Sequence, residues 1–233
     1  MRQIYFIGLL AVAFCIPAFS PAIAQQASPY VVEQQTTSRY KDFRVAVGGG
    51  YAYRLAERKK ESDPALEKFS KQLMHGYAID LDGQYFFKES WGLGLNANYV
   101  STSASGDNIT IPNVGSGNVS EKQGFFYVGP SFVSRSEYNR FLVLYSLSIG
   151  PLFFTDDVTY NGMNATGSAT TVGLNAGIAG EYKINGKTGV GIKLSYTMGN
   201  INSINMEGQN IQSDEKISVS NLMITAFLSF RSW

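Results

Sequence analysis

The sequence predicts an all-β fold, an eight-stranded antiparallel up-and-down transmembrane β-barrel, and three observations support this prediction. Hydrophobic and polar residues alternate with a period of two along eight segments. Short turns and long polar stretches separate these segments in strict alternation. Charged residues make up only 16% of the chain, against about 25% in ordinary soluble domains.

The alternating segments are spaced along the whole chain after residue 41. They span about 42–55, 73–87, 91–101, 122–134, 140–153, 168–184, 188–199 and 215–231. An even number of antiparallel strands allows a sheet to close on itself and leaves no edge unpaired. The count therefore favours a closed barrel over an open sheet.

The connections between the segments differ in length in a regular way. Short breaks fall at 88–90, 136–139 and 185–187, whereas long polar stretches fall at 57–72, 101–120, 155–167 and 200–214. Tight turns at one end and long loops at the other are typical of outer-membrane barrels, whose long loops face outward. In the first loop, Pro64–Phe69 after Asp63 predicts a short capped helical turn.

The segment WGLGLNANYV, residues 91–100, raises the question of which face meets lipid. Leu93 and Leu95 lie on one parity, and Gly94 and Asn96 lie on the other. Across the segments this second parity is mostly Gly, Ala, Ser and Asn, which suits the cramped interior of an eight-stranded barrel. We therefore predict that the apolar parity faces lipid. A soluble lipocalin-like barrel with an apolar lumen is the less favoured alternative.

Alternation also predicts the positions of charged and aromatic side chains. The charged residues placed inside the barrel are Arg44, Asp80, Asp82, Glu181 and Lys193. We expect them to form a salt-bridge network that fills the lumen and fixes the strand register, rather than a polar track for a solute. The aromatic residues expected at the two membrane interfaces include Trp91 and Phe230 near the short turns and Tyr53, Tyr99 and Tyr196 towards the long loops.

The N-terminal 24 residues resemble a secretory signal peptide. Arg2 precedes an apolar run from Ile4 to Phe19 that ends in an A-x-A site at Ala22–Ala24. We expect cleavage after Ala24, a periplasmic N-terminal segment over 25–41 and a barrel over 42–233. Cys15 leaves with the signal, so the mature chain has no thiol. Without Arg2 the basic and acidic residues are equal in number, and nucleic acid is not predicted as a partner.

Few residues suggest chemistry. His75 is the only histidine, and a catalytic base needs a nucleophile and an orienting acid that the pattern does not identify. Asp156 and Asp157 lack the alternating oxygen ligands of a calcium loop and are interpreted as a solvated turn. We predict no catalytic residue, cofactor or metal ligand, and a lipid A-modifying enzyme is the least favoured function.

Three features indicate a known family. The predicted export signal ends in AIAQQ, one strand has the sequence FFYVGPSF, and the final residue is the aromatic Trp233. The chain resembles the small eight-stranded outer-membrane barrels of the OmpA membrane domain and OmpX, especially Bacteroidota-type barrels. The resemblance implies an outer-membrane location, periplasmic termini, and contacts with lipid, lipopolysaccharide and the barrel-insertion machinery.

Two residues depart from the pattern that the resemblance implies. Arg231 lies two residues before Trp233, where such barrels usually have an apolar residue, so the register of the last strand is open by one residue. Pro130 lacks the N–H that a strand ladder needs, which predicts a bulge or a local break in the fourth strand.

The predicted function follows from these features. The leading hypothesis is a non-enzymatic barrel with a polar interior filled by side chains and four long extracellular loops. These loops would serve adhesion or the binding of an extracellular protein or surface ligand. A narrow channel for small or apolar solutes is the alternative.

Overall fold

The computed structural model describes residues 42–55, 63–111, 115–206 and 209–232, and for 111 and 209–215 it describes the backbone alone. The predicted signal peptide (1–24), the predicted periplasmic segment (25–41) and Trp233 lie outside the described residues.

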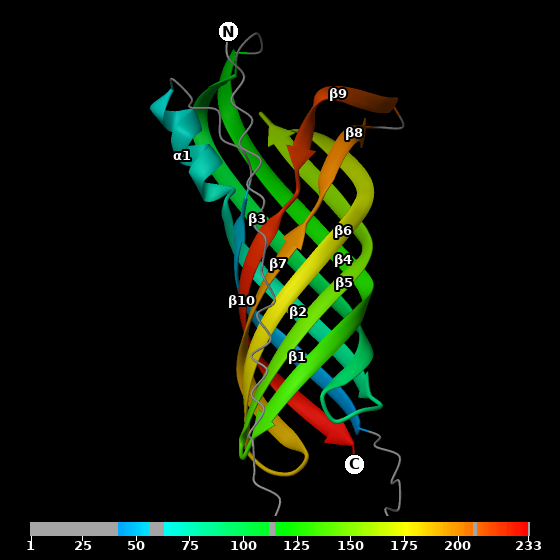
Figure 1. Ribbon diagram of the computed structural model, residues 1–233. Helices are drawn as coiled ribbons and strands as arrows, with labels where there is room; N and C mark the ends of the chain where they lie inside the picture. The colour runs from blue at the N-terminus through cyan, green and yellow to red at the C-terminus, as the bar shows by residue number, and fades with distance from the viewer. Residues whose placement is uncertain (1–41, 56–62, 112–114, 207–208, 233) are drawn as a thin grey trace, which may run out of the picture. The chain divides into compact units, whose positions relative to one another are not determined.

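Eight strands form a closed antiparallel ring (Figure 1). They are β1 (Asp42–Arg54), β2 (His75–Phe86), β3 (Trp91–Ile111), β4 (Gly115–Tyr138), β5 (Phe141–Tyr160), β6 (Met163–Lys183), β7 (Thr188–Met198) and β10 (Asn221–Ser232). From β1 to β7 each strand pairs with the next, and β10 pairs with both β7 and β1. The predicted eight-stranded antiparallel barrel is therefore confirmed.

The short turns are confirmed at one end of the barrel. They span 87–90, 139–140 and 184–187. The second turn is later and shorter than the predicted 136–139, because the β4–β5 ladder continues to Tyr138 opposite Phe141. Asn139 adopts a φ of 54°, a conformation that asparagine tolerates better than most residues. The Asn185 carboxamide oxygen accepts hydrogen bonds from the backbone N–H groups of Lys187 and Thr188, both at 2.8 Å. Both turns are thus fixed by local asparagine chemistry.

Three of the four predicted long loops are largely paired strand, which corrects the sequence prediction. β3 to β6 continue through 101–111, 115–120 and 155–167, and 200–214 contains β8 (Asn200–Met206) and most of β9 (Gln209–Ser218). The abundance of Ser, Thr, Asn and Gly suggested loops. However, Val119 and Val158 keep the inward-facing period of two, and the ladder satisfies the backbone polar groups. The predicted last strand (215–231) is divided at Val219 and Ser220.

The predicted helical turn is confirmed as α1 (Pro64–Gln72). The Asp63 carboxylate accepts a hydrogen bond from the Ala65 N–H at 2.9 Å, and Pro64 occupies the first turn. Phe69 and Leu73, at the end of α1, are buried in one cluster with Ala104, Ile109 and Val119 of β3 and β4. Among the described residues, no helix is long and apolar enough to cross a membrane.

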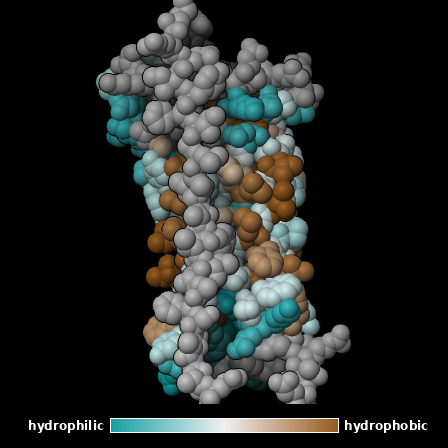
Figure 2. All heavy atoms as spheres, in the orientation of Figure 1, coloured by the Kyte–Doolittle hydropathy of each residue, from teal (hydrophilic) through white to brown (hydrophobic). Residues whose placement is uncertain are grey.

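An apolar belt surrounds the barrel and confirms the predicted orientation of the faces. Leu93 and Leu95 are 55% and 53% exposed, whereas Asn96 on the same strand is 1% exposed. The belt consists of the outward-facing residues over 43–53, 77–85, 91–99, 126–132, 141–153, 172–182, 190–198 and 222–230. None of these outward positions carries a charge, as expected of a lipid-facing band about 25 Å tall. Figure 2 shows the apolar side chains gathered at mid-height, with hydrophilic side chains above and below.

The structure settles the register of the last strand. Phe230 is 52% exposed on the belt, and Arg231 is 7% exposed on the inward parity. Above the belt lies a second region, which we call the crown. It comprises residues 63–74, 102–111, 115–123, 155–168, 200–206 and 209–218.

Candidate functional site

The lumen contains an ionic layer near the short-turn end. Glu181 pairs with Arg44 at 2.7 Å and with Arg231 at 2.8 Å, and all three side chains are at most 2% exposed. Arg135 pairs with Asp42 at 2.5 Å, and these two side chains are also buried. Buried charges so close together require such pairing, because burying an unpaired charge in a dry interior costs several kcal/mol of free energy, about 3–5 kcal/mol when one partner is removed.

A second ionic layer lies nearer the middle of the barrel. The Lys193 ammonium contacts Asp80 and Asp82, each at 2.7 Å. The Asn96 amide donates to the same two carboxylates at 3.0 and 2.9 Å. Strand pairing aligns these residues, because Asp82 lies opposite Asn96 in the β2–β3 ladder. Lys193 reaches them across the lumen from β7.

The five predicted interior charges therefore fall into two separate groups. Asp80, Asp82 and Lys193 form one, and Arg44 and Glu181 form the other. Sequence reasoning missed Arg135, because the predicted fourth strand ended at residue 134. It also missed Asp42, the first residue of the first predicted segment, and the uncertain last register hid Arg231. Extending the fourth predicted strand by one residue would have identified Arg135. Asp42 and Arg231 already lay within the first and last predicted segments, at their ends and on the inward parity.

Two apolar clusters also occupy the lumen, which corrects the prediction of a polar interior. Near the short turns the cluster consists of Ala46, Phe86, Val133, Leu142, Leu144, Ala179 and Phe227. At the base of the crown the second cluster consists of Ala52, Ala78, Val100, Phe125, Tyr127, Leu152, Phe154, Ile201, Val219 and Met223. In the runs FFYV and LFF the apolar residues occupy both parities. A period of two therefore could not show that Phe125 and Phe154 point inward.

The barrel wall has a break between β4 and β5. Their pairing stops at Tyr127 opposite Leu152 and resumes at Ser131 opposite Ser148 in the same register. The predicted irregularity at Pro130 is therefore a local break without a bulge. The skipped residues have the sequences VGP (128–130) and IGP (149–151), which face each other in antiparallel order.

The two prolines explain this break. The backbones are close across the break. A β-carbon on Gly150 would lie 2.0 Å from the Val128 carbonyl oxygen, and one on Gly129 would lie 2.5 Å from the Ile149 carbonyl oxygen. In an antiparallel ladder these carbonyls would accept from residues 151 and 130, which are both prolines and have no N–H. A methyl group on Gly129 would lie 2.6 Å from the Tyr127 hydroxyl. The Tyr127 side chain therefore covers the inner side of the break.

A cluster of polar groups lies at the mouth of the lumen, where the crown begins. The Gln123 amide donates to Glu121 at 2.5 Å, and its carbonyl oxygen accepts from Arg54. Asp156 of β5 lies beside Glu121, and burial together with the Asp156 charge raises the pKa of Glu121 to about 7. Around neutral pH, Glu121 and Asp156 therefore share less than two full negative charges.

The predicted interface aromatics lie at the two edges of the belt. Trp91 packs edge-to-face against Phe87 with ring centroids 4.2 Å apart, beside a short turn. Phe230 is at the same end, opposite Val45. Tyr99 lies 6.5 Å from Tyr77, centroid to centroid, at the crown end.

The other two predicted interface tyrosines, Tyr53 and Tyr196, lie with His75 at the crown end of the belt. Tyr196 pairs with Leu222, and the Tyr53 ring contacts His75. The exposed His75 ring also receives a contact from the Tyr51 hydroxyl. The described contacts of His75 are thus with tyrosines. Among the described residues, no group of three or more His, Cys, Asp or Glu side chains could hold a metal.

Comparisons with known proteins identify the fold. No protein-family model matches the sequence, and no curated protein matches it. Among solved structures, a major outer membrane protein from Thermus thermophilus superposes with a TM-score of 0.55 and 12% identity, covering 83% of this chain and 100% of that one. OprG from Pseudomonas aeruginosa superposes with a TM-score of 0.54 and 13% identity, covering 83% and 97%. The chain therefore has the fold of the small outer-membrane β-barrels. Its uncharged apolar belt has the character that a lipid-facing surface requires.

Proposed function

We propose that the protein is a non-enzymatic outer-membrane barrel that presents its crown to an extracellular protein or surface ligand. The observation that carries this proposal is the length of β3 to β6. These strands have 20 to 24 residues, whereas a tilted strand needs only about 9–11 residues to cross the bilayer. The additional residues form an ordered surface outside the membrane.

The crown has its own packing. The cluster around Phe69 and Ile109 joins α1 to the sheet. Between the two long hairpins, the N–H of Asn161 in the β5–β6 turn donates to the carbonyl of Asn118 in β4 at 3.0 Å. In return the Asn161 carboxamide oxygen accepts from the Asn118 N–H at 2.9 Å. Such preorganisation reduces the entropy lost on binding a partner.

The filled lumen supports a scaffold rather than an open pore. Two ionic layers and two apolar clusters alternate along it, and side chains from all eight strands of the ring contribute. An eight-stranded barrel has an interior just wide enough for its own side chains. We propose that the ionic layers fix strand register and close the lumen, as the sequence predicted.

A crown-shortened variant tests this function. Residues 103–122 would be replaced by a short turn that joins Thr102 to Gln123, which are paired neighbours in the β3–β4 ladder. We expect cells carrying this variant to lose attachment to host cells or extracellular matrix, while heat-modifiable gel migration shows an intact barrel. A variant with Asn139 and Arg140, the short turn at the opposite end, replaced by another two-residue turn is the matched control. Unchanged attachment of the crown-shortened cells would refute the proposal.

The break between β4 and β5 favours a second candidate, a narrow path for apolar solutes. The missing hydrogen bonds lie within the belt, directly below the apolar cluster that contains Tyr127. A solute that displaced Tyr127 would leave the lumen sideways into lipid.

Permeation measurements separate the two candidates. Liposomes containing the barrel would be loaded with an indicator for a small apolar solute, and planar bilayers would report ion conductance. If the path operates, the double variant Pro130→Val and Pro151→Val slows solute entry by restoring both N–H donors. A barrel that neither conducts nor accelerates entry supports the scaffold.

A further inference from the structure

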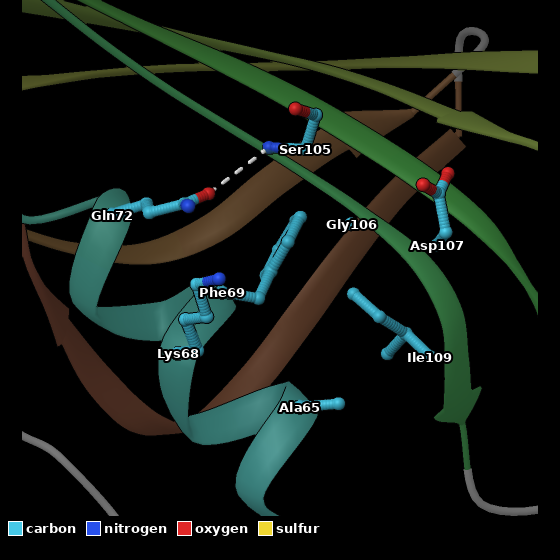
Figure 3. A pocket seen from close by; sticks show the side chains of 8 residues that line it. All are labelled: Ala65, Lys68, Phe69, Gln72, Ser105, Gly106, Asp107 and Ile109. Atoms are coloured by element: carbon cyan, nitrogen blue, oxygen red, sulfur yellow. Dashed lines mark hydrogen bonds between the residues drawn. The ribbon is translucent and has the colours of Figure 1, made fainter.

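A small cavity lies in the crown between α1 and β3 (Figure 3). Its volume is about 210 Å³, and its lining residues are Ala65, Lys68, Phe69, Gln72, Ser105, Gly106, Asp107 and Ile109. This volume is below the roughly 300–1,000 Å³ of pockets for drug-sized ligands. The cavity therefore fits a compact molecule, and it lies outside the lumen, the wall break and the mouth cluster.

A bulge in β3 shapes this cavity. The β3–β4 register shifts between Gly106 and Ile109, and Asn108 adopts a φ of 58°. One extra residue on β3 resets the alternation, so Ile109 is buried at 2% exposure while Asp107 is exposed at the cavity rim. A methyl group on Gly106 would lie 2.6 Å from the Ile109 side chain. Glycine at this position therefore keeps the cavity floor open.

The helix supplies the opposite wall. Phe69 is buried at 7% exposure and forms part of the apolar floor. The Gln72 side-chain oxygen accepts from the Ser105 N–H at 3.4 Å, which ties the end of α1 to β3. Figure 3 shows Lys68 and Asp107 on opposite sides of the Phe69 ring.

The two charged side chains at the cavity rim, Lys68 and Asp107, are opposite in sign. Neither Lys68 nor Asp107 has an ion-pair partner among the described residues. By contrast, Lys71 on the same helix is paired with Glu67 at 2.6 Å. An apolar floor flanked by one cationic and one anionic group is complementary to an apolar molecule that carries both charges.

We propose that this cavity binds a small apolar zwitterion, an α-amino acid with a branched aliphatic side chain. The ligand carboxylate contacts the Lys68 ammonium, its ammonium contacts the Asp107 carboxylate, and its side chain packs on Phe69 and Ile109. This site goes beyond the proposed surface-contact function, because a ligand of this size leaves the outer surface of the crown free. Its small size and exposed rim give a Kd on the order of millimolar.

Three matched ligands test the assignment on the refolded full chain in detergent micelles, with amide chemical shifts in α1 and β3 as the readout. L-leucine carries both charges, 3-methylbutylamine lacks the carboxylate, and 4-methylpentanoate lacks the ammonium. We expect L-leucine to bind about two- to fivefold more tightly than either analogue, the difference that exposed ion pairs typically give.

Two charge variants then assign each contact. Lys68→Gln should lower the affinity for L-leucine to that for 3-methylbutylamine without changing binding of the amine. Asp107→Asn should lower it to that for 4-methylpentanoate without changing binding of the acid. Gly106→Ala narrows the floor of the cavity and should lower the affinity for all three ligands equally. Lys71→Gln, on the same helix but outside the cavity, should change none of them.

The result that overturns the proposal is equally specific. Absence of saturable shifts with L-leucine, or equal affinity for all three ligands in the native chain, would exclude a zwitterion site. Shifts that persist unchanged in both Lys68→Gln and Asp107→Asn would indicate adsorption elsewhere. None of these results bears on cell attachment, so the cavity and the proposed surface function fail independently.

Discussion

The barrel has a tall half and a short half. β3, β4, β5 and β6 have 20 to 24 residues, whereas β1, β2, β7 and β10 have 11 to 13. The apolar belt continues around both halves, because every strand needs the same minimum length to cross a membrane. The difference teaches that the tall half serves two environments in one strand, with lipid around its lower part and water around its crown.

The same strand consequently follows two rules. Along β3, the outward positions Leu93 and Leu95 are apolar, and the outward Ser103 above the belt is polar and exposed. Inside the belt the charges of the two ionic layers are paired and buried, whereas the crown holds exposed pairs such as Lys71 with Glu67. Four predictions test this contrast, from the largest expected effect to the smallest.

The largest effect is expected from the buried ionic layer. Lys193→Met leaves Asp80 and Asp82 without their cation, and we expect a loss of about 3–5 kcal/mol in the free energy of unfolding. Urea titration in lipid vesicles, followed by tryptophan fluorescence, measures this change. The crown control Lys71→Met removes an exposed pair and should cost less than about 0.5 kcal/mol. Equal effects of the two variants would contradict the distinction between lumen and crown.

The next effect compares two outward positions of one strand. Leu95→Lys places a charge in lipid and should cost about 2–4 kcal/mol near the bilayer midplane. Ser103→Lys, further along β3, should change the free energy of unfolding by less than about 0.5 kcal/mol, because that position is in water. The same urea titration compares them. A large loss for Ser103→Lys would show that the belt extends higher than its apolar residues indicate.

A smaller effect of opposite sign is expected at the wall break. Pro130→Val and Pro151→Val each supply an N–H opposite an existing carbonyl, and one hydrogen bond contributes about 0.5–1.5 kcal/mol. We expect each variant to unfold at a higher urea concentration than the native chain. Hydrogen exchange at the new amides provides an independent measurement. A loss of stability would mean that the prolines fit a strand path that valine does not.

The smallest effect is the pH dependence of the crown. The folded protein raises the pKa of Glu121 from its ordinary 4.5 to about 7, so the folded crown binds this proton more tightly than the unfolded chain. The resulting stability is fully present below about pH 4.5 and is lost as the pH rises through about 7. Limited proteolysis of the crown should therefore be faster at about pH 8 than at about pH 5. Glu121→Gln should flatten this dependence, and a steeper one would contradict the assignment.

The alternation of apolar and polar residues was sufficient to predict which residues form the belt and some of those that fill the lumen. The predictions for Leu95 and Asn96 were correct because lipid and lumen impose opposite demands on successive residues. The positions of Asp80 and Lys193 followed from the same parity. Alternation could not predict the facing of residues where both faces are apolar, as around Phe125 and Phe154. There the inward residues are as apolar as the outward residues of the belt, so the sequence does not distinguish them.

The sequence by itself determined the number of strands in the ring, their antiparallel order, the short turns and the face that meets lipid. Each of these depends on local residue patterns that the bilayer enforces. Only the tertiary structure decided that the predicted loops are crown strands, that Glu181 joins Arg44 and Arg231, and that VGP faces IGP across the wall. These features depend on which distant residues lie opposite one another, and strand pairing across the closed ring sets that.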